Sequence, residues 1–435
     1  MDGKINDVLG GRGILSIAPN ELSAPIELLM ELTWKCNLKC VHCMMNAEYC
    51  PENEPEDGEL TTEEIKGIID RACELGVAHI DFSGGEPLLR KDIFEILEYS
   101  SKKGVEPCLL SNGTLITEEV AKKLKEVGVY KIELNLDGHT AELYDSFRGV
   151  KGAFDKTITA IKAVQKAGIP LRVNSMLCKP LYPYFEDIIE YAGQLGIVEL
   201  CFVPLRIAGQ TVENYDKLAY TPLEYAEMLP RITDIKIKMQ EKYKMVILFL
   251  GDTDIGNYIN PNSMFPSCGA GRLHCTIGAD GSVRPCPAFP QEEEFIAGNI
   301  RERDIADIWQ NAEIFKKLRN PNISGCDTCE NKSCVGGCRV QSLWKYGDVM
   351  QGPEPYCEKV ITKEMKTSVY KGYKQDKIEM RGDRAEMSDF PLYLNTVAGG
   401  LDRRDQAIGG FSFAVVRQRL VYFTYRSMSL MHIES

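Results

Sequence analysis

The feature that most constrains the fold is a recurring Gly-Val or Gly-Ile pair between helix-like and strand-like segments. The pairs begin at Gly76, Gly104, Gly128, Gly168 and Gly196, with spacings of 28, 24, 40 and 28 residues. Glycine after a helix-like stretch fits the left-handed conformation in which many helices end. Each spacing is the size of one strand–helix unit, so the sequence predicts repeated βα units that form a parallel sheet.

Six strand-like runs accompany this pattern, and a helix is predicted from Thr61. The helix begins with a capping box, Thr61-x-x-Glu64, and its apolar residues recur at helical spacing. The predicted strands cover 27–33, 78–82, 107–111, 130–136, 171–176 and 198–203. We therefore expect an α/β fold, a partial (β/α)6 parallel barrel, whose active groups collect at the C-terminal ends of the strands.

Four segments are expected along the chain. Residues 1–25 are an N-terminal extension, and 26–265 contain the partial barrel with connecting helices, including one over 222–243. Residues 266–360 form a small cysteine-rich domain with a hairpin signal at Ala279-Asp280-Gly281. Residues 361–435 are expected to be a C-terminal tail, helical at first and poorly ordered from about 381.

Charge and composition exclude several classes of protein. The net charge of −12 argues against binding of nucleic acid, which relies on Lys and Arg. No run of 18 apolar residues and no signal-peptide pattern is present in the sequence, so we expect a cytoplasmic protein without membrane segments. Sixteen cysteines in the reducing cytosol indicate metal or cluster ligation rather than disulfides.

Three cysteines lie in one short run after the first predicted strand. Cys36, Cys40 and Cys43 have the spacing C-x3-C-x2-C. Three thiolates are one fewer than a [4Fe-4S] cluster needs, and no fourth cysteine follows at the close spacing of a ferredoxin loop. The pattern predicts a [4Fe-4S] cluster with one iron open to a ligand that reacts there.

A second motif follows one βα unit later, at the end of the second predicted strand. In Ser83-Gly84-Gly85-Glu86-Pro87, glycines permit close backbone approach and Glu86 can accept from an ammonium group. The two motifs together resemble those of the radical S-adenosylmethionine (SAM) superfamily. The resemblance implies SAM as cofactor, with its amino group bound by Gly84, Gly85, Glu86 and Pro87.

Further positions resemble SAM contacts of this family. The resemblance implies contacts from Ser111 and Asn112 at the third strand end, and from Asn174 on the fifth strand. Asn135-Leu136-Asp137-Gly138 is similar to a Ser-Leu-Asp-Gly element, with Asn135 where serine is usual. Arg148 resembles the family's arginine for the methionine carboxylate. No catalytic acid or base can be named from the sequence.

The late cysteines carry a second resemblance, to the SPASM domain with two auxiliary iron–sulfur clusters, taken here as [4Fe-4S]. Four residues separate Cys329 and Cys334 where five are usual. The resemblance implies that the outer cluster is ligated by Cys326, Cys329, Cys334 and Cys357, and the inner one by Cys268, Cys286 and Cys338. Cys275 is either the fourth inner ligand or a buried thiol in the hairpin strand. A zinc site at Cys326/Cys329 and Cys334/Cys338 is the alternative, but it leaves the other cysteines unexplained.

The leading hypothesis is therefore a radical SAM enzyme that abstracts hydrogen from a peptide or protein substrate undergoing maturation. It implies an external electron donor such as flavodoxin or ferredoxin. The 35 residues before Cys36 are too few for the peptide-binding domain that some peptide maturases carry. A tetrapyrrole or other small-molecule substrate is the alternative. A non-catalytic electron carrier would explain the late cysteines but not the Gly-Gly-Glu-Pro motif.

Overall fold

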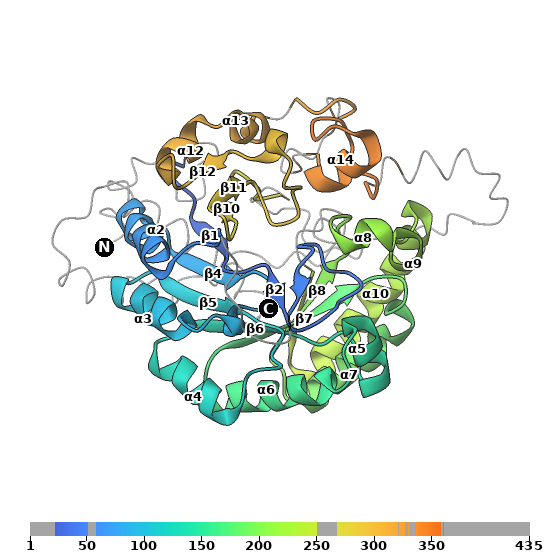
Figure 1. The fold of residues 1–435 in the computed structure, drawn as a ribbon. Helices are drawn as coiled ribbons and strands as arrows, with labels where there is room; N and C mark the ends of the chain where they lie inside the picture. Colours follow the sequence, from blue (N-terminus) through green and yellow to red (C-terminus); the bar gives the residue numbers. More distant parts are fainter. Residues whose placement is uncertain are drawn as a thin grey trace, which may run out of the picture.

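A computed structural model gives the fold, which Figure 1 shows as a ribbon. The described residues are 22–50, 58–249, 268–320, 322–326, 329, 334, 336–357 and 360. Expectations for residues 1–21 and for the tail 361–435 lie outside this range. We call the described residues from 268 to 357 the auxiliary segment.

One sheet of ten strands runs through the described part of the chain, in the order β12-β11-β10-β1-β4-β5-β6-β7-β8-β9. All neighbours from β10 to β9 are parallel, and β10, β11 and β12 pair antiparallel. The strands are β1 (Glu27–Glu31), β4 (His79–Ser83), β5 (Glu106–Leu110), β6 (Lys131–Asn135), β7 (Leu171–Leu177), β8 (Glu199–Pro204), β9 (Val246–Phe249), β10 (His274–Ile277), β11 (Ser282–Arg284) and β12 (Gly298–Asn299). The six predicted strands and the open, parallel arrangement are confirmed.

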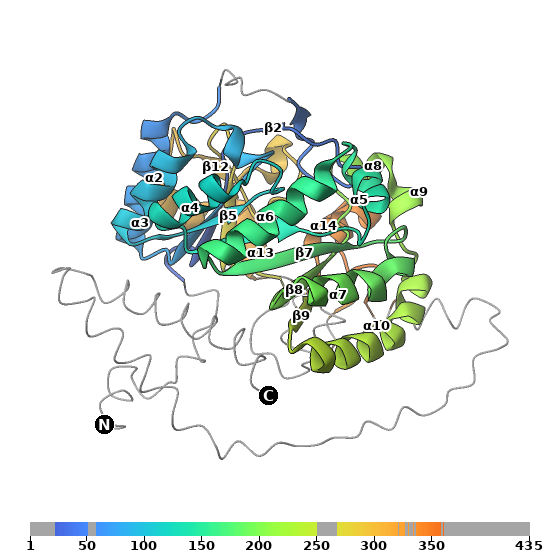
Figure 2. The ribbon, with the colours of Figure 1, turned by 90° about the horizontal axis from the view of Figure 1, so that it is seen from below.

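Most helices of the barrel lie along an arc outside the strands in Figure 1, and in Figure 2, seen from below, α4 and α6 lie in front of the strands. The helices of this part of the chain are α2 (Thr62–Leu75), α3 (Ile93–Lys103), α4 (Glu118–Glu126), α5 (Ala141–Arg148), α6 (Ala153–Ala167), α7 (Phe185–Gln194), α8 (Gln210–Glu213), α9 (Tyr215–Leu218) and α10 (Pro222–Tyr243). The auxiliary segment adds α12 (Ile305–Asn311), α13 (Glu313–Arg319) and α14 (Arg339–Tyr346). Short 3-10 turns are η3 (Pro87–Leu89), η4 (Tyr182–Tyr184) and η5 (Glu293–Phe295).

The local signals work as the sequence predicts. Thr61 caps α2 in a capping box with Glu64, and Gly76 ends the helix at φ 75°. The other four punctuating glycines also have positive φ. The buried face of α2, Ile65, Ile69 and Ala72 among others, joins the main hydrophobic core with the outward residues of the strands. Burial of such side chains, about 1.5–3 kcal/mol each, is what holds helices against the sheet.

The auxiliary segment is continuous with the barrel sheet. β10 pairs with β1 in parallel, from Glu27 opposite His274 to Met30 opposite Ile277. β10 and β11 form the predicted hairpin. A buried ion pair, Arg284 Nη2 to Glu31 Oε2 at 2.5 Å, reinforces this joint. Figure 1 shows the auxiliary segment, in gold and orange, above the barrel strands.

Among the described helices, none is both long enough and apolar enough to cross a bilayer.

Candidate functional site

The three-cysteine loop leaves the C-terminal end of β1 and folds back on itself. Its two ends pair as short parallel strands, β2 (Lys35–Cys36) and β3 (Glu48–Tyr49). The Cys43 N–H donates to the Cys40 carbonyl at 3.2 Å, which makes a tight turn. Neighbouring segments hold the loop in place. The Gln210 N–H donates to the Cys43 carbonyl at 2.8 Å, and the Lys39 N–H donates to the Arg148 carbonyl at 3.0 Å.

Burial and neighbouring negative charges oppose ionisation of two thiols of this loop in the absence of metal. Burial, with the charge of Glu86 and the charges of Cys40 and Cys43, raises the pKa of the Cys36 thiol to about 12. Burial also raises the pKa of Cys40, although Arg148 opposes this shift. Clustered thiols that resist ionisation without a metal become thiolates when iron coordinates them. The three cysteines therefore suit the cluster that the sequence predicts, although the ligand assignment stays a prediction.

The Gly-Gly-Glu-Pro turn packs directly under the cysteine loop. Gly84 has φ +128°, and a Cβ there would lie 2.4 Å from the Thr33 carbonyl oxygen. A Cβ at Gly85 would lie 2.0 Å from the Lys35 carbonyl oxygen. The Gly85 N–H donates to Thr33 and the Glu86 N–H donates to Lys35. The two glycines are thus required by backbone-to-backbone packing, in addition to any approach of SAM.

Glu86 connects the ends of β4 and β5. It is fully buried, and burial raises the pKa of its carboxyl to about 7 against the hydrogen bonds that it accepts. Those bonds come from the Leu88 N–H at 3.1 Å, the Ser111 hydroxyl at 2.9 Å and the Asn112 N–H at 2.8 Å. The side-chain amide of Asn112 also donates to Cys36 Sγ, with an Nδ2 to Sγ distance of 3.8 Å. The structure therefore brings Glu86, Ser111 and Asn112 together beside the cysteine loop.

Arg148 lies beside the same loop, at the end of α5. Its guanidinium pairs with Asp137 and its Nη1 is 3.6 Å from Cys40 Sγ, while its Nε has no partner among the described residues. Asp137 in turn accepts from the Met176 N–H at 2.6 Å. Sequence reasoning missed Asp137 as a functional residue. Its place in the quoted strand-end element was the available signal, because a carboxylate there orients the neighbouring arginine.

The two asparagines have different surroundings. The Asn135 amide donates to the Ser111 carbonyl at 3.5 Å, which places it in the Glu86 group. The Asn174 amide donates to Glu133 at 2.9 Å, and Glu133 also pairs with Arg172. Asn174 therefore belongs to a charged network on the inward faces of β6 and β7. SAM contacts by Asn135, Asn174 and Arg148 stay predictions.

The predicted inner auxiliary cysteines lie together. Burial raises the pKa of the Cys286 thiol to about 12, and the charges of Cys268 and Cys338 add to the shift. Cys338 likewise acts on Cys268. The Cys338 N–H donates to Glu354 at 2.8 Å, which fixes that backbone. Three mutually close, half-buried cysteines from separate segments fit an iron–sulfur cluster.

Cys275 is differently placed. It lies in β10, its thiol is fully buried in the hydrophobic core, and the charged groups that act on it are Arg319 and Glu27. This environment favours the buried-thiol alternative. Of the predicted outer cysteines, Cys326 lies beside the segment that leads to Cys357, since Ser324 bridges Gln351. The Cys329 N–H donates to Cys326 at 3.0 Å.

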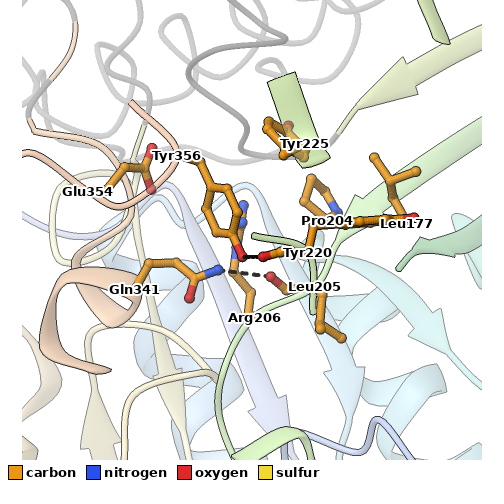
Figure 3. A pocket seen from close by; sticks show the side chains of 9 residues that line it. All are labelled: Leu177, Pro204, Leu205, Arg206, Tyr220, Tyr225, Gln341, Glu354 and Tyr356. Atoms are coloured by element: carbon orange, nitrogen blue, oxygen red, sulfur yellow. Dashed lines mark hydrogen bonds between the residues drawn. The ribbon is translucent and has the colours of Figure 1, made fainter. Parts of the chain in front are cut away.

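A pocket of about 400 Å³, its open mouth included, lies between the barrel and the auxiliary segment (Figure 3). Leu177 and Pro204, the last residues of β7 and β8, form part of its wall. The rest consists of Leu205, Arg206, Tyr220, Tyr225, Gln341, Glu354 and Tyr356. Two hydrogen bonds cross between the two parts here, from Gln341 Nε2 to the Leu205 carbonyl and from the Tyr356 hydroxyl to the Tyr220 carbonyl, each at 2.9 Å.

Comparisons with known proteins agree with this site. The sequence model of the radical SAM superfamily matches residues 30–195, and that of an iron–sulfur cluster-binding domain, SPASM, matches residues 268–334. The AdoMet-dependent heme synthase of Methanosarcina barkeri is 34% identical over 353 residues, which cover 77% of this chain and 97% of that protein. The mycofactocin maturase MftC of Mycolicibacterium smegmatis is 31% identical over 342 residues, covering 77% and 83%.

The fold is also that of solved structures. Streptococcus suis SuiB bound to precursor peptide SuiA superposes with a TM-score of 0.64 at 22% identity, over 78% of this chain and 77% of that one. A parallel half-barrel with a three-cysteine loop at its strand ends defines an enzyme of the radical SAM class. The chain belongs to the radical SAM superfamily, in the branch that carries a SPASM auxiliary domain. Its cofactors are SAM and iron–sulfur clusters, which supply the electron and the 5′-deoxyadenosyl radical that removes substrate hydrogen.

Proposed function

We propose that this radical SAM enzyme modifies a peptide, and that the pocket of Figure 3 receives part of it. The pocket opens at the strand ends. It also borders the inner auxiliary cysteines, because its Glu354 accepts a hydrogen bond from the Cys338 N–H. The pocket is open to solvent, so a peptide that extends beyond its mouth can place one or a few side chains inside it.

The charges of the pocket support the same choice. Its lining has one cation, Arg206, and one anion, Glu354, among apolar and aromatic side chains. A tetrapyrrole with several carboxylates needs a surplus of cationic partners. Two relatives, the mycofactocin maturase and the PqqA peptide cyclase, align over 77% of the chain, and the name of the second specifies a peptide substrate.

The roles proposed for this chain's residues follow from the site. Cys36, Cys40 and Cys43 hold the SAM-binding cluster. Glu86 fixes Ser111 and Asn112 as polar contacts for SAM, and Arg148, oriented by Asp137, faces the same loop. We propose domain boundaries at 26–265 and 266–360, an external flavodoxin or ferredoxin as electron donor, and the cytoplasm as location, because the ligand thiols require a reducing compartment.

Tetrapyrrole modification is the second candidate, favoured by the 34% identity to the heme synthase over nearly that protein's whole length. The test uses anaerobically reconstituted protein with reductant and SAM. A short precursor peptide encoded next to the gene is compared with an iron tetrapyrrole bearing propionates. We expect the peptide to accelerate 5′-deoxyadenosine formation and to change in mass. Decarboxylation of the tetrapyrrole with an inert peptide would overturn the proposal.

A control separates substrate choice from radical formation. Replacing Cys36, Cys40 and Cys43 together with alanine should abolish SAM cleavage with either substrate while auxiliary-cluster absorbance remains. SAM cleavage that survives this change would contradict the assignment of the loop.

A further inference from the structure

A second group of metal-ligand side chains lies on the inward face of the sheet, away from the SAM site. It consists of His79 and Asp81 on β4 and Cys108 on β5, and their ligand atoms all lie within 4.8 Å of one another. The register places Asp81 directly opposite Cys108. His79 begins β4, whereas Ser83 ends it beside the Gly-Gly-Glu-Pro turn. Along the strand, His79 is four residues, about 13 Å, from Ser83, and Asp81 is two residues, about 7 Å, from it.

Two carboxyl groups flank the His79 imidazole. Glu27 on β1 lies opposite His79 in the register, and its Oε2 is 3.4 Å from His79 Nε2. The same Nε2 is 3.7 Å from Asp81 Oδ1. Burial and then the charge of Glu27 raise the pKa of Asp81, whereas His79 and Arg172 oppose this shift. His274 on β10 also lies opposite Glu27 and acts on it. A divalent cation is therefore suggested by the three converging donor atoms of His79, Asp81 and Cys108, and not by a shortage of positive charge.

We propose that this group binds one Zn²⁺ ion through His79, Asp81 and Cys108. Zinc accepts the nitrogen, oxygen and sulfur donors that these three side chains offer, and a water molecule supplies the fourth position. Ligand atoms around tetrahedral zinc are roughly 3.3–3.8 Å apart, so the group must contract by about 1 Å, which side-chain rotation provides. Binding displaces the Cys108 thiol proton and any proton held by His79 or Asp81, and involves no change of oxidation state.

At this position the ion would also have a structural role. Its three ligands come from two adjacent strands, β4 and β5, and lie on the N-terminal side of the Gly-Gly-Glu-Pro turn. Zinc there would cross-link these strands and relieve the repulsion between Glu27 and Asp81. Cys108, whose thiol burial keeps protonated in the absence of metal, would become a thiolate ligand.

The test uses full-length protein whose cluster cysteines have first been filled anaerobically with iron and sulfide. After incubation with Zn²⁺ and gel filtration, we expect about one zinc per chain, with one sulfur and several nitrogen or oxygen neighbours in the zinc K-edge spectrum. His79→Ala and the shape-preserving Asp81→Asn should each weaken zinc retention at least about tenfold. Cys108→Ser should remove the sulfur neighbour. Zinc should raise the melting temperature of the wild type but not that of His79→Ala or Asp81→Asn.

Cys201→Ser is the matched control, because Cys201 is also buried in this sheet, on β8, outside the proposed site. It should bind zinc as the wild type does. Zinc with sulfur neighbours alone, or zinc retained equally by the folded Asp81→Asn variant, would show adventitious loading of cluster cysteines and overturn the proposal. Retention below about 0.1 equivalent would overturn it as well, leaving a metal-free proton-sharing network.

Discussion

At the scale of single residues, the glycines of the Gly-Gly-Glu-Pro turn show how steric demands and cofactor chemistry coincide. Gly85→Ala would place a Cβ 2.0 Å from the Lys35 carbonyl oxygen, so the cysteine loop would have to move. We expect loss of most SAM cleavage, measured as 5′-deoxyadenosine per chain. Gly67→Ala is the control, because its Cβ meets nothing within 4 Å in exposed helix α2. It should leave activity intact and stabilise the helix by about 1 kcal/mol. Equal activity of both variants would contradict the packing account.

Cys275 and Cys286 make a second comparison between residues. Three [4Fe-4S] clusters require about 12 irons per chain. Cys275 contacts the hydrophobic core, so Cys275→Ala should keep this iron count. Cys286→Ala should lose up to about four irons, because its thiol lies with Cys268 and Cys338. Iron and sulfide analysis after reconstitution provides the measurement. An iron loss in Cys275→Ala as large as that in Cys286→Ala would restore it as a ligand.

Glu31 links stability to pH. Burial raises the pKa of its carboxyl from 4.5 to about 7, against the opposing charge of Arg284. Between these values the folded state binds more protons than the unfolded state, so the contribution of Glu31 to the free energy of unfolding falls as pH rises. The free energy of unfolding of the wild type should fall relative to that of Glu31→Gln by up to about 3 kcal/mol between pH 4.5 and 7. Melting temperatures across this range test it. Exposed Glu119→Gln should show no such trend, and a wild type that gains stability relative to Glu31→Gln as pH rises would contradict the prediction.

At the scale of elements, two helices begin with the same device. Thr61 with Glu64 caps α2, and Thr221 with Glu224 caps α10. Thr61→Ala and Thr221→Ala should each cost about 1 kcal/mol of unfolding free energy, because one helical N–H loses its acceptor. The two losses should add, since the helices do not share partners. Urea unfolding of the single and double variants measures this. Thr159→Ala, within α6, should cost much less.

Local signals explain why these elements were predictable from sequence. Capping threonines and terminal glycines act within one helical turn. The helix bounds at Thr61, Gly76 and Pro222 can therefore be predicted from the local sequence. The strand runs follow from their apolar residues. By contrast, the pairing of β10 with β1 joins residues about 250 apart, and no local pattern encodes it. β9 is not predicted from the sequence, because it has only four residues and follows closely on the long helix α10.

The same distinction between local and long-range features applies to the residues of the candidate site. Cys36, Cys40 and Cys43 and the glycine turn are contiguous motifs, so sequence found them. The pairing of Arg148 with Asp137 and that of Arg284 with Glu31 depend on the fold. Their members are common charged residues, and only tertiary structure shows that each pair is buried. The role of Cys275 was undecided in sequence, because a spacing does not reveal the direction of a strand's side chains.

At the scale of the whole molecule, β1 occupies an unusual position. It is hydrogen-bonded on one side to β4 of the barrel and on the other to β10 of the auxiliary segment. It also leads directly into the cysteine loop. The strand that leads into the cysteine loop is therefore also the strand that pairs with the auxiliary segment.

This shared strand means that the SPASM part is not a detachable module. A chain ended before residue 268 would expose the free edge of β1, whose sequence Glu-Leu-Leu-Met-Glu is largely apolar. Unpaired apolar edges recruit other strands, so the shortened protein should self-associate rather than persist as a smaller enzyme. Domain exchange between members of this superfamily would have to preserve a strand that pairs with β1. The order of the domains along the chain does not show this constraint.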